Sequence, residues 1–248
     1  MNKTSIFLVL VISILTVFFV FSAKKNKESI PAPTVNPLLF SEYNPQINPT
    51  DFTFKITNKY FSLPVGRKLV YQSQTSGGTE KIEIEIESAT KEIMGVKTTI
   101  YRDKVYLNNT LVEDTRDYLA QDKEGNVWYF GEEVDNYEDG KLIDHTGSFI
   151  AGEDRAKPGI WIKAVNIVGD SYRQEYYPDE AEDVTDVVAT GQTVIVGDKT
   201  YTGCVKMYDW TPLDDESKEY KYYCPEVSAM VLVEDLTSGE KTELLKIN

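Results

Sequence analysis

The sequence has few of the residues from which most enzyme active sites are built. His145 is the one histidine among its 248 residues, which leaves neither a histidine-rich metal site nor a histidine-paired nucleophile. The G-x-S-x-G elbow, the P-loop and the dinucleotide-binding glycine pattern are also absent from the sequence. We therefore expect no cofactor and favour a non-enzymatic function. His145, beside the turn at Gly147, is interpreted as a loop residue, with a general base as the alternative.

Basic residues are scarce as well. The chain holds 26 Lys and Arg against 40 Asp and Glu, and its net charge is −14. A surface of this sign repels phosphate backbones, and no basic stripe interrupts it, so we expect no nucleic-acid partner. Such acidity suits solubility outside the cell and the binding of divalent cations, cationic ligands or neutral ligands.

The one long apolar run lies near the N-terminus. It extends from Ile6 to Phe21 and, with Ser22 and Ala23, reaches 18 residues, the lower limit for crossing a bilayer. We predict an apolar helix that directs export and contacts the membrane through residues 6–23. No cysteine follows the run, which excludes a lipid anchor on cysteine. An uncleaved anchor is favoured because Phe21 suits a cleavage site poorly; the alternative is a signal peptide cleaved near Ser22 and Ala23, which would secrete the domain.

Composition divides the chain into three parts. Residues 1–23 are the membrane anchor or signal peptide. Residues 24–52 contain five prolines without helical or strand periodicity, which favours extended polyproline-type chain and a tether. Residues 53–248 read as strands, and we expect one extracytoplasmic antiparallel β domain there.

Strict alternation is the clearest structural signal. Ile82, Ile84 and Ile86 alternate with charged residues within 79–88, which predicts a strand with one buried and one wet face. Turn signals follow at Glu124-Gly125-Asn126, at the type I′ dipeptide Asp139-Gly140, at Gly197-Asp198 and at Ser238-Gly239. They predict an all-β fold, either a curled antiparallel sheet or a partly closed barrel, with one or two helical turns at most, within 179–188.

The two cysteines are Cys204 and Cys224. Strand-like segments surround them and are joined by a turn at 212–215, and position 214 is the midpoint between the cysteines. They are predicted to face each other across a hairpin and, outside the cytoplasm, to form a disulfide. Two separate buried thiols are the alternative, and a metal site is disfavoured because two sulfurs lack histidine partners.

One predicted strand carries charge on both faces. Glu113, Thr115 and Asp117 share one face, whereas Asp114 and Arg116 share the other. A strand on a closed sheet normally has one apolar face. This strand is therefore expected at a sheet edge or lining a polar cavity.

The segment that follows this strand places aromatic side chains next to acidic ones. Aromatic rings beside carboxylates suit a small-molecule, glycan, peptide or cationic ligand. The candidate ligand-binding residues are Glu113, Asp114, Arg116, Asp117, Trp128 and Glu132. The favoured alternative is an internal network in which Arg116 only neutralises neighbouring carboxylates.

A second acidic cluster lies within 179–186. Its oxygen ligands suit Ca²⁺, but their spacing matches no EF-hand loop. Glu182 and Asp183 are therefore weak metal candidates, and a solvated loop is favoured.

Several motifs resemble those of a known group of proteins. They are Glu113-Asp114-Thr115-Arg116-Asp117, Ala120-Gln121-Asp122, Gly125-Asn126-Val127-Trp128-Tyr129-Phe130-Gly131-Glu132, Gly169-Asp170-Ser171-Tyr172-Arg173-Gln174-Glu175 and Ala181-Glu182-Asp183. Together they resemble a widespread, functionally uncharacterised family of exported bacterial proteins. The resemblance implies export and a β domain, but no known activity. The chain departs from that pattern at 225–230, where a glycine-rich turn is expected. More loosely, the strand pattern is similar to the half-barrels of periplasmic lipid carriers.

Two classes of function follow. The favoured class is a membrane-tethered or secreted envelope domain that binds a ligand in a β concavity or has a structural role, without catalysis. The other class is a carboxylate-dependent hydrolase, with or without Ca²⁺. A polar pocket formed by Asp114, Arg116 and Glu132 would favour binding over a structural role.

Overall fold

The computed structural model describes residues 43–248, and almost every regular element in them is a β-strand. The apolar helix expected near the N-terminus lies outside the described residues. Alternation explains the strands: Ile82, Ile84 and Ile86 are at most 2% exposed, and the glutamates between them are exposed. The all-β class is confirmed.

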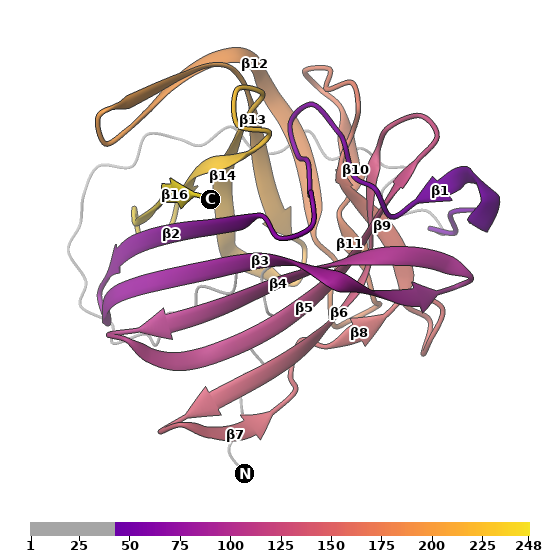
Figure 1. Ribbon diagram of the computed structural model, residues 1–248, viewed down its shortest axis with the longest axis horizontal. Helices are drawn as coiled ribbons and strands as arrows, with labels where there is room; N and C mark the ends of the chain where they lie inside the picture. Colours follow the sequence, from indigo (N-terminus) through magenta and orange to yellow (C-terminus); the bar gives the residue numbers. More distant parts are fainter. Residues whose placement is uncertain (1–42) are drawn as a thin grey trace.

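Sixteen strands in the described residues pair into one sheet (Figure 1). They are β1 (Phe52–Thr53), β2 (Lys68–Thr75), β3 (Gly78–Ile93), β4 (Val96–Leu107), β5 (Thr110–Asp122), β6 (Val127–Glu138), β7 (Lys141–Asp144), β8 (Phe149–Ile150), β9 (Lys157–Ile162), β10 (Ser171–Arg173), β11 (Glu175–Tyr176), β12 (Val184–Val196), β13 (Lys199–Thr211), β14 (Asp214–Cys224), β15 (Ala229–Asp235) and β16 (Lys241–Ile247). A 3₁₀ turn, η2, precedes β1 at Pro49–Asp51. No helix within the described range is long and apolar enough to cross a membrane.

The strands pair in a consistently antiparallel order. From edge to edge the order is β10-β12-β13-β14-β15-β16-β2-β3-β4-β5-β6-β9-β11. Strand β1 adds to β5, and β7 and β8 add to β6. Figure 1 shows β2 to β6 as the near wall, with β12 to β14 curving behind it.

One short segment, residues 171–176, brings the two edges of the sheet together. Its first part, β10, pairs with β12 at one edge, and its second part, β11, pairs with β9 at the other. The sheet is therefore a nearly closed antiparallel barrel, which confirms the expected curled or partly closed sheet. Gly159 permits this closure, because a Cβ added there would lie 2.2 Å from the carbonyl oxygen of Gln174.

Hairpins occur at the turns that the sequence predicts. Asp139 and Gly140 have φ angles of 50° and 73°, the left-handed conformations of a type I′ turn, and they connect β6 to β7. The turns at 124–126, 197–198 and 238–239 connect β5 to β6, β12 to β13 and β15 to β16.

The prediction of one or two helical turns within 179–188 is wrong. Tyr177 and Ala181 form an isolated β-bridge, and β12 begins at Val184. Pairing with β13 gives this backbone the ladder hydrogen bonds that a helix of one or two turns would leave largely unmade.

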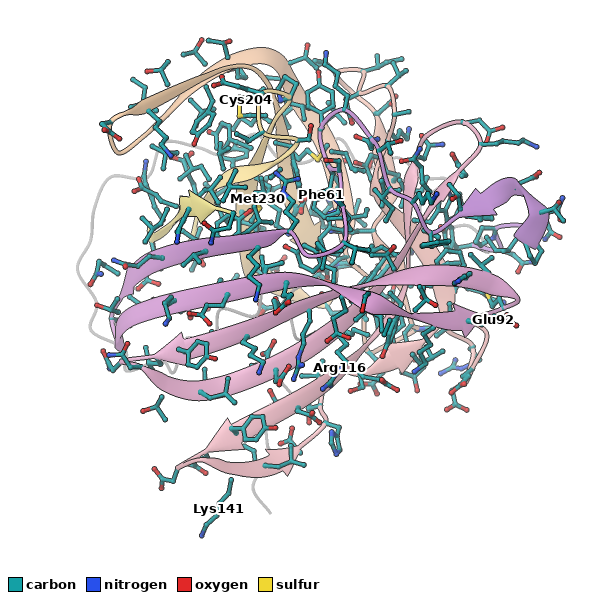
Figure 2. The ribbon with its side chains drawn as sticks, in the orientation of Figure 1. Phe61, Glu92, Arg116, Lys141, Cys204 and Met230 are labelled. Carbon is teal, nitrogen blue, oxygen red and sulfur yellow. A yellow bond between two sulfur atoms is a disulfide. The ribbon has the colours of Figure 1, made fainter. Side chains whose placement is uncertain are left out.

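The β13–β14 hairpin has the register that the cysteine spacing predicts. Val205 lies opposite Tyr223, so the next residues along, Cys204 and Cys224, lie opposite each other. They form a disulfide with Cα atoms 4.2 Å apart (Cys204 is labelled in Figure 2), and both are fully buried. The predicted disulfide is confirmed, and it stabilises the fold by about 3 kcal/mol in the chain-entropy model.

Residues 54–66, the plug segment, fill the end of the barrel from which β2 starts. The ring of Phe61 lies 5.8 Å from that of Tyr101, 5.4 Å from Trp161 and 6.0 Å from Tyr223, centroid to centroid. These partners belong to β4, β9 and β14, on different sides of the barrel. The plug segment therefore makes this end of the interior apolar.

Residues 43–52, the described part of the expected tether, lie against the outside of the barrel. The hydroxyl of Tyr43 donates to the carbonyl oxygen of Pro158 at 3.0 Å. Phe52 packs edge-on against Phe130, with ring centroids 5.5 Å apart. The folded part of the chain therefore includes residues 43–52.

Candidate functional site in the barrel interior

The charged strand singled out by the sequence is β5, which lies between β4 and β6 and is not an edge strand. Glu113 and Asp117 are 3% and 1% exposed and face the inside of the barrel. Glu132 on β6 lies opposite Asp117 and is 1% exposed. These three predicted site residues therefore come together in the interior.

The other predicted site residues lie on the outside. Arg102 donates to both carboxylate oxygens of Asp114, at 2.7 and 2.6 Å. Arg116 lies on the near wall in Figure 2, 3.6 Å from the carboxylate of Asp135. Trp128 belongs to an apolar cluster outside the barrel. The structure therefore divides the predicted site between the two faces of the sheet.

The interior holds more acidic residues than the sequence singles out. Eleven Asp and Glu residues of the described chain are buried. Two of them, Asp114 and Asp122, are hydrogen-bonded outside the barrel, to Arg102 and to Asn126. The other nine, which we call the interior carboxyls, are Glu80, Asp103, Glu113, Asp117, Glu132, Glu175, Asp183, Asp209 and Glu219.

Basic residues neutralise only part of this set. Lys221 is 2% exposed, and its ammonium lies 2.9 Å from Asp209 and 2.8 Å from Glu219. Burial alone would lower the pKa of Lys221, but these two carboxylates raise it well above its usual value. Arg173, the other buried basic residue of the described chain, pairs with Glu182 at 3.2 Å. Lys221 is thus the principal counter-charge of the interior.

Burial makes several of the interior carboxyls weak acids by raising their pKa values. It raises the pKa of Asp117 and of Asp183 to about 7. It raises the pKa values of Asp103, Glu132 and Glu175 well above their usual range, and repulsion between neighbouring carboxyls adds to the effect. These groups therefore retain protons near neutral pH unless a positive charge approaches them.

Charge repulsion links eight of the nine interior carboxyls into a continuous series. Neighbours repel each other in the order Glu80, Glu113, Asp103, Asp117, Glu132, Glu175, Asp183 and Asp209. The series begins on β3 in the near wall, crosses to β6 and passes through the closing segment to β13. The acidic groups therefore form one connected lining instead of isolated pairs.

Glu175 is the most extreme of these groups. It is 0% exposed, and no side chain or backbone group in the described range donates a hydrogen bond to either of its oxygens. Asp103, Asp117 and Asp183 each have one oxygen in the same situation among the described residues. The hydroxyl of Tyr129 donates to the other oxygen of Asp117 at 2.8 Å. Buried polar groups are normally hydrogen-bonded, so these oxygens mark positions where a donor belongs.

Such carboxyls can act in two ways. In the ionised form they neutralise a cation and accept its hydrogen bonds. In the protonated form, an acid whose pKa is near 7 can transfer a proton as a general acid.

The weak metal candidates are separated in the structure. Glu182 is engaged by Arg173, whereas Asp183 lies in the interior. Within residues 43–248, no group of three or more His, Cys, Asp or Glu side chains is arranged to hold a metal ion.

Six of the interior residues are not among the candidate site residues that the sequence predicts: Glu80, Asp103, Glu175, Asp209, Glu219 and Lys221. A signal exists for Glu80, because the two-residue period of Ile82, Ile84 and Ile86 extends back to it. No such signal exists for Glu175, whose strand, β11, is two residues long.

Comparison with known proteins finds one similar solved structure, at low identity. No protein-family model matches the chain, and no curated protein matches it. A solved structure described as a "putative lipoprotein" from Parabacteroides distasonis is similar at 13% identity with a TM-score of 0.41, over 76% of this chain and 98% of that one. At that score the likeness carries no argument about fold or function. The family resemblance of the motifs therefore stays a prediction.

Proposed function

We propose that this protein is an envelope binding domain whose barrel interior takes a small cationic ligand with N–H donors. The observation that carries the proposal is Glu175, a fully buried carboxyl to which nothing in the described chain donates. It stands within a lining of nine acidic residues in which Lys221 is the principal counter-charge.

The interior lacks positive charge and lacks hydrogen-bond donors for its carboxyl oxygens, and a cation with N–H groups supplies both. Leaving a buried carboxylate unpaired costs several kcal/mol, and protonation removes the charge but leaves the acceptor oxygens without donors. An ammonium group supplies a positive charge and three N–H groups together. A ligand of this class therefore satisfies the interior more fully than protons alone.

The proposed location is outside the cytoplasm. The buried Cys204–Cys224 disulfide supports it, because disulfides persist in oxidising compartments. Residues 1–23 are proposed as an anchor or as a cleaved signal peptide. The chain from residue 24 up to the packed segment at 43–52 is proposed as the remaining tether.

Thermal unfolding of the full-length protein tests the binding proposal. Butylammonium is compared with sodium at equal ionic strength, at pH 8 and at pH 5. Binding at a hundred times the Kd corresponds to about 2.7 kcal/mol of stabilisation. We expect a higher Tm with butylammonium at pH 8 and a much smaller effect at pH 5, where the cation competes with bound protons.

Two variants make this result specific. Glu175→Gln should abolish the stabilisation at pH 8. Glu83→Gln, a matched control on the exposed face of β3, should retain it. Equal stabilisation at both pH values, or full stabilisation of Glu175→Gln, would overturn the proposal.

A carboxylate-dependent hydrolase is the second candidate. The observation that favours it is the Asp117–Glu132 pair, two acids directly opposite each other with raised pKa values. Turnover of a chromogenic glycoside that is lost in both Asp117→Asn and Glu132→Gln would favour catalysis over binding.

A further inference from the structure

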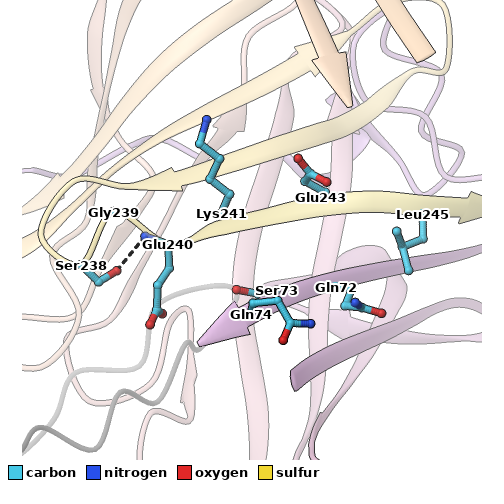
Figure 3. A pocket seen from close by; sticks show the side chains of 9 residues that line it. All are labelled: Gln72, Ser73, Gln74, Ser238, Gly239, Glu240, Lys241, Glu243 and Leu245. Atoms are coloured by element: carbon cyan, nitrogen blue, oxygen red, sulfur yellow. Dashed lines mark hydrogen bonds between the residues drawn. The ribbon is translucent and has the colours of Figure 1, made fainter. Parts of the chain in front are cut away.

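Two cavities in the described part of the chain differ in size and lining. The cavity beside the turn that joins β15 to β16 has a volume of about 370 Å³, and polar residues, Glu240 and Glu243 among them, form most of its wall (Figure 3). The cavity beside the plug segment is larger, about 560 Å³, and no acidic residue of the described chain lines it. We call it the plug cavity. Its volume is that of a typical small-molecule site.

The wall of the plug cavity is mainly apolar. Its apolar lining residues are Phe54, Ile56, Leu63, Pro64 and Val65. Val65 is 59% exposed, and Pro64 is exposed as well, so apolar surface meets water at the mouth of the cavity. An alkyl chain that covers such surface gains affinity by up to about fourfold for each methylene it buries.

Polar groups in the same wall already have hydrogen-bond partners. The hydroxyl of Thr99 donates to the carbonyl oxygen of Phe54. The side-chain amide of Asn58 donates to the carbonyl oxygen of Gly125 at 2.9 Å. A sugar or another highly polar ligand would therefore find few new partners along this wall, whereas an alkyl chain needs none.

The charged residues in the described lining are two lysines. Lys55 and Lys59 both line the cavity, and both are exposed. Within residues 43–248, neither ammonium group forms an ion pair with a carboxylate. A third ammonium group, that of Lys97, lies 4.5 Å from the ring centroid of Phe54. In a chain whose net charge is −14, a lining of this sign favours an anionic group.

We infer that the plug cavity binds a straight-chain alkyl carboxylate, the class to which fatty acids belong. The alkyl chain covers Pro64 and Val65, and the carboxylate meets the ammonium groups of Lys55 and Lys59. Ion pairs at exposed positions are weak, so the chain supplies most of the affinity and the lysines select the charge. The inference does not rest on the proposed function, because this ligand is an anion and its site lies outside the barrel interior.

Calorimetric titration of the full-length protein in lipid nanodiscs measures this binding, with protein-free nanodiscs as the blank. Octanoate should bind saturably at pH 8, with one site per chain. Hexanoate, which is two methylenes shorter, should bind several-fold more weakly, up to about fifteenfold. Equal affinities for octanoate and hexanoate would overturn the inference, because the chain would then contribute nothing.

Paired variants separate the two lysines from general charge. Lys55→Gln combined with Lys59→Gln should weaken octanoate binding at least about threefold and leave the binding of uncharged 1-octanol within about twofold. Lys199→Gln combined with Lys246→Gln removes the same charge from exposed positions outside the cavity and should leave both ligands unaffected. Equal weakening of octanoate in the two double variants would overturn the inference.

A charge placed in the apolar wall tests the position of the alkyl chain. Val65→Asp should weaken octanoate and 1-octanol at least about tenfold, because each would bury a carboxylate. Ile167→Asp is the matched control, since Ile167 is 60% exposed and lies outside the cavity, and it should bind both ligands normally. Undiminished binding to Val65→Asp would overturn the inference. A wild-type dimer that separates in Val65→Asp, seen by native mass spectrometry, would assign the cavity to a second copy and overturn it too.

Discussion

Asp117 allows the buried charge to be tested by a single substitution. Burial raises the pKa of its carboxyl from 3.8 to about 7. One of its oxygens accepts a hydrogen bond from Tyr129, and the other has no partner in the described chain. An asparagine accepts the same hydrogen bond and carries no charge, so Asp117→Asn removes the ionisation while it conserves the shape.

The expected effect has a definite sign. The native state holds the Asp117 proton more tightly than the unfolded state does, so this group contributes stability that is present below pH 4 and is lost as the pH rises through about 7. A rise of about 3 in pKa corresponds to at most about 4 kcal/mol. Neighbouring carboxyls share the effect. We therefore expect the free energy of unfolding of Asp117→Asn to exceed that of the wild type by roughly 1–4 kcal/mol at pH 8 and by less than about 1 kcal/mol at pH 4.

Urea unfolding of both proteins between pH 4 and pH 8, with the disulfide intact, measures this difference. Glu85→Gln, on the exposed face of β3, is the matched control and should follow the wild-type profile. Parallel profiles for the wild type and Asp117→Asn would refute the reasoning, because Asp117 would then have a similar pKa in the native and unfolded states.

Three further predictions concern the framework. Cys204→Ser should lower the free energy of unfolding by about 2–5 kcal/mol in oxidised protein and have little effect after reduction, and alkylation before reduction should label neither cysteine in the wild type. Lys221→Met should cost about 3–5 kcal/mol by urea unfolding at pH 8, because Asp209 and Glu219 lose their counter-charge; an unchanged midpoint would contradict the ion-paired group. A reporter that is active only outside the cytoplasm, fused after Asn248, should give signal, whereas activity of a cytoplasm-only reporter would refute export.

Local patterns predict the walls of this barrel well. The period of two at Ile82, Ile84 and Ile86 depends only on one buried face. The Cys204–Cys224 register depends only on the midpoint of a hairpin. Both patterns lie within about twenty residues of sequence and require no distant contact. The folded protein therefore has the strand faces and the hairpin register that they predict.

The interior site depends on contacts that no local pattern contains. Alternation along the strand places Asp114 and Asp117 on opposite faces, but only the closure of the barrel decides which of the two faces is enclosed. Glu175 meets Asp183 and Lys221 because residues 171–176 bridge the two edges of the sheet. The chain has forty Asp and Glu residues. The pairing order of the strands decides which of them become buried, and no local sequence pattern contains that order.

Native mass spectrometry of the full-length protein, isolated from its host at pH 8, tests the central claim most directly. The account predicts a bound organic amine that is released on acidification below about pH 5, as the interior carboxyls regain their protons, and that is missing from Glu175→Gln. A bare polypeptide mass at pH 8, unchanged by added amines, would contradict it.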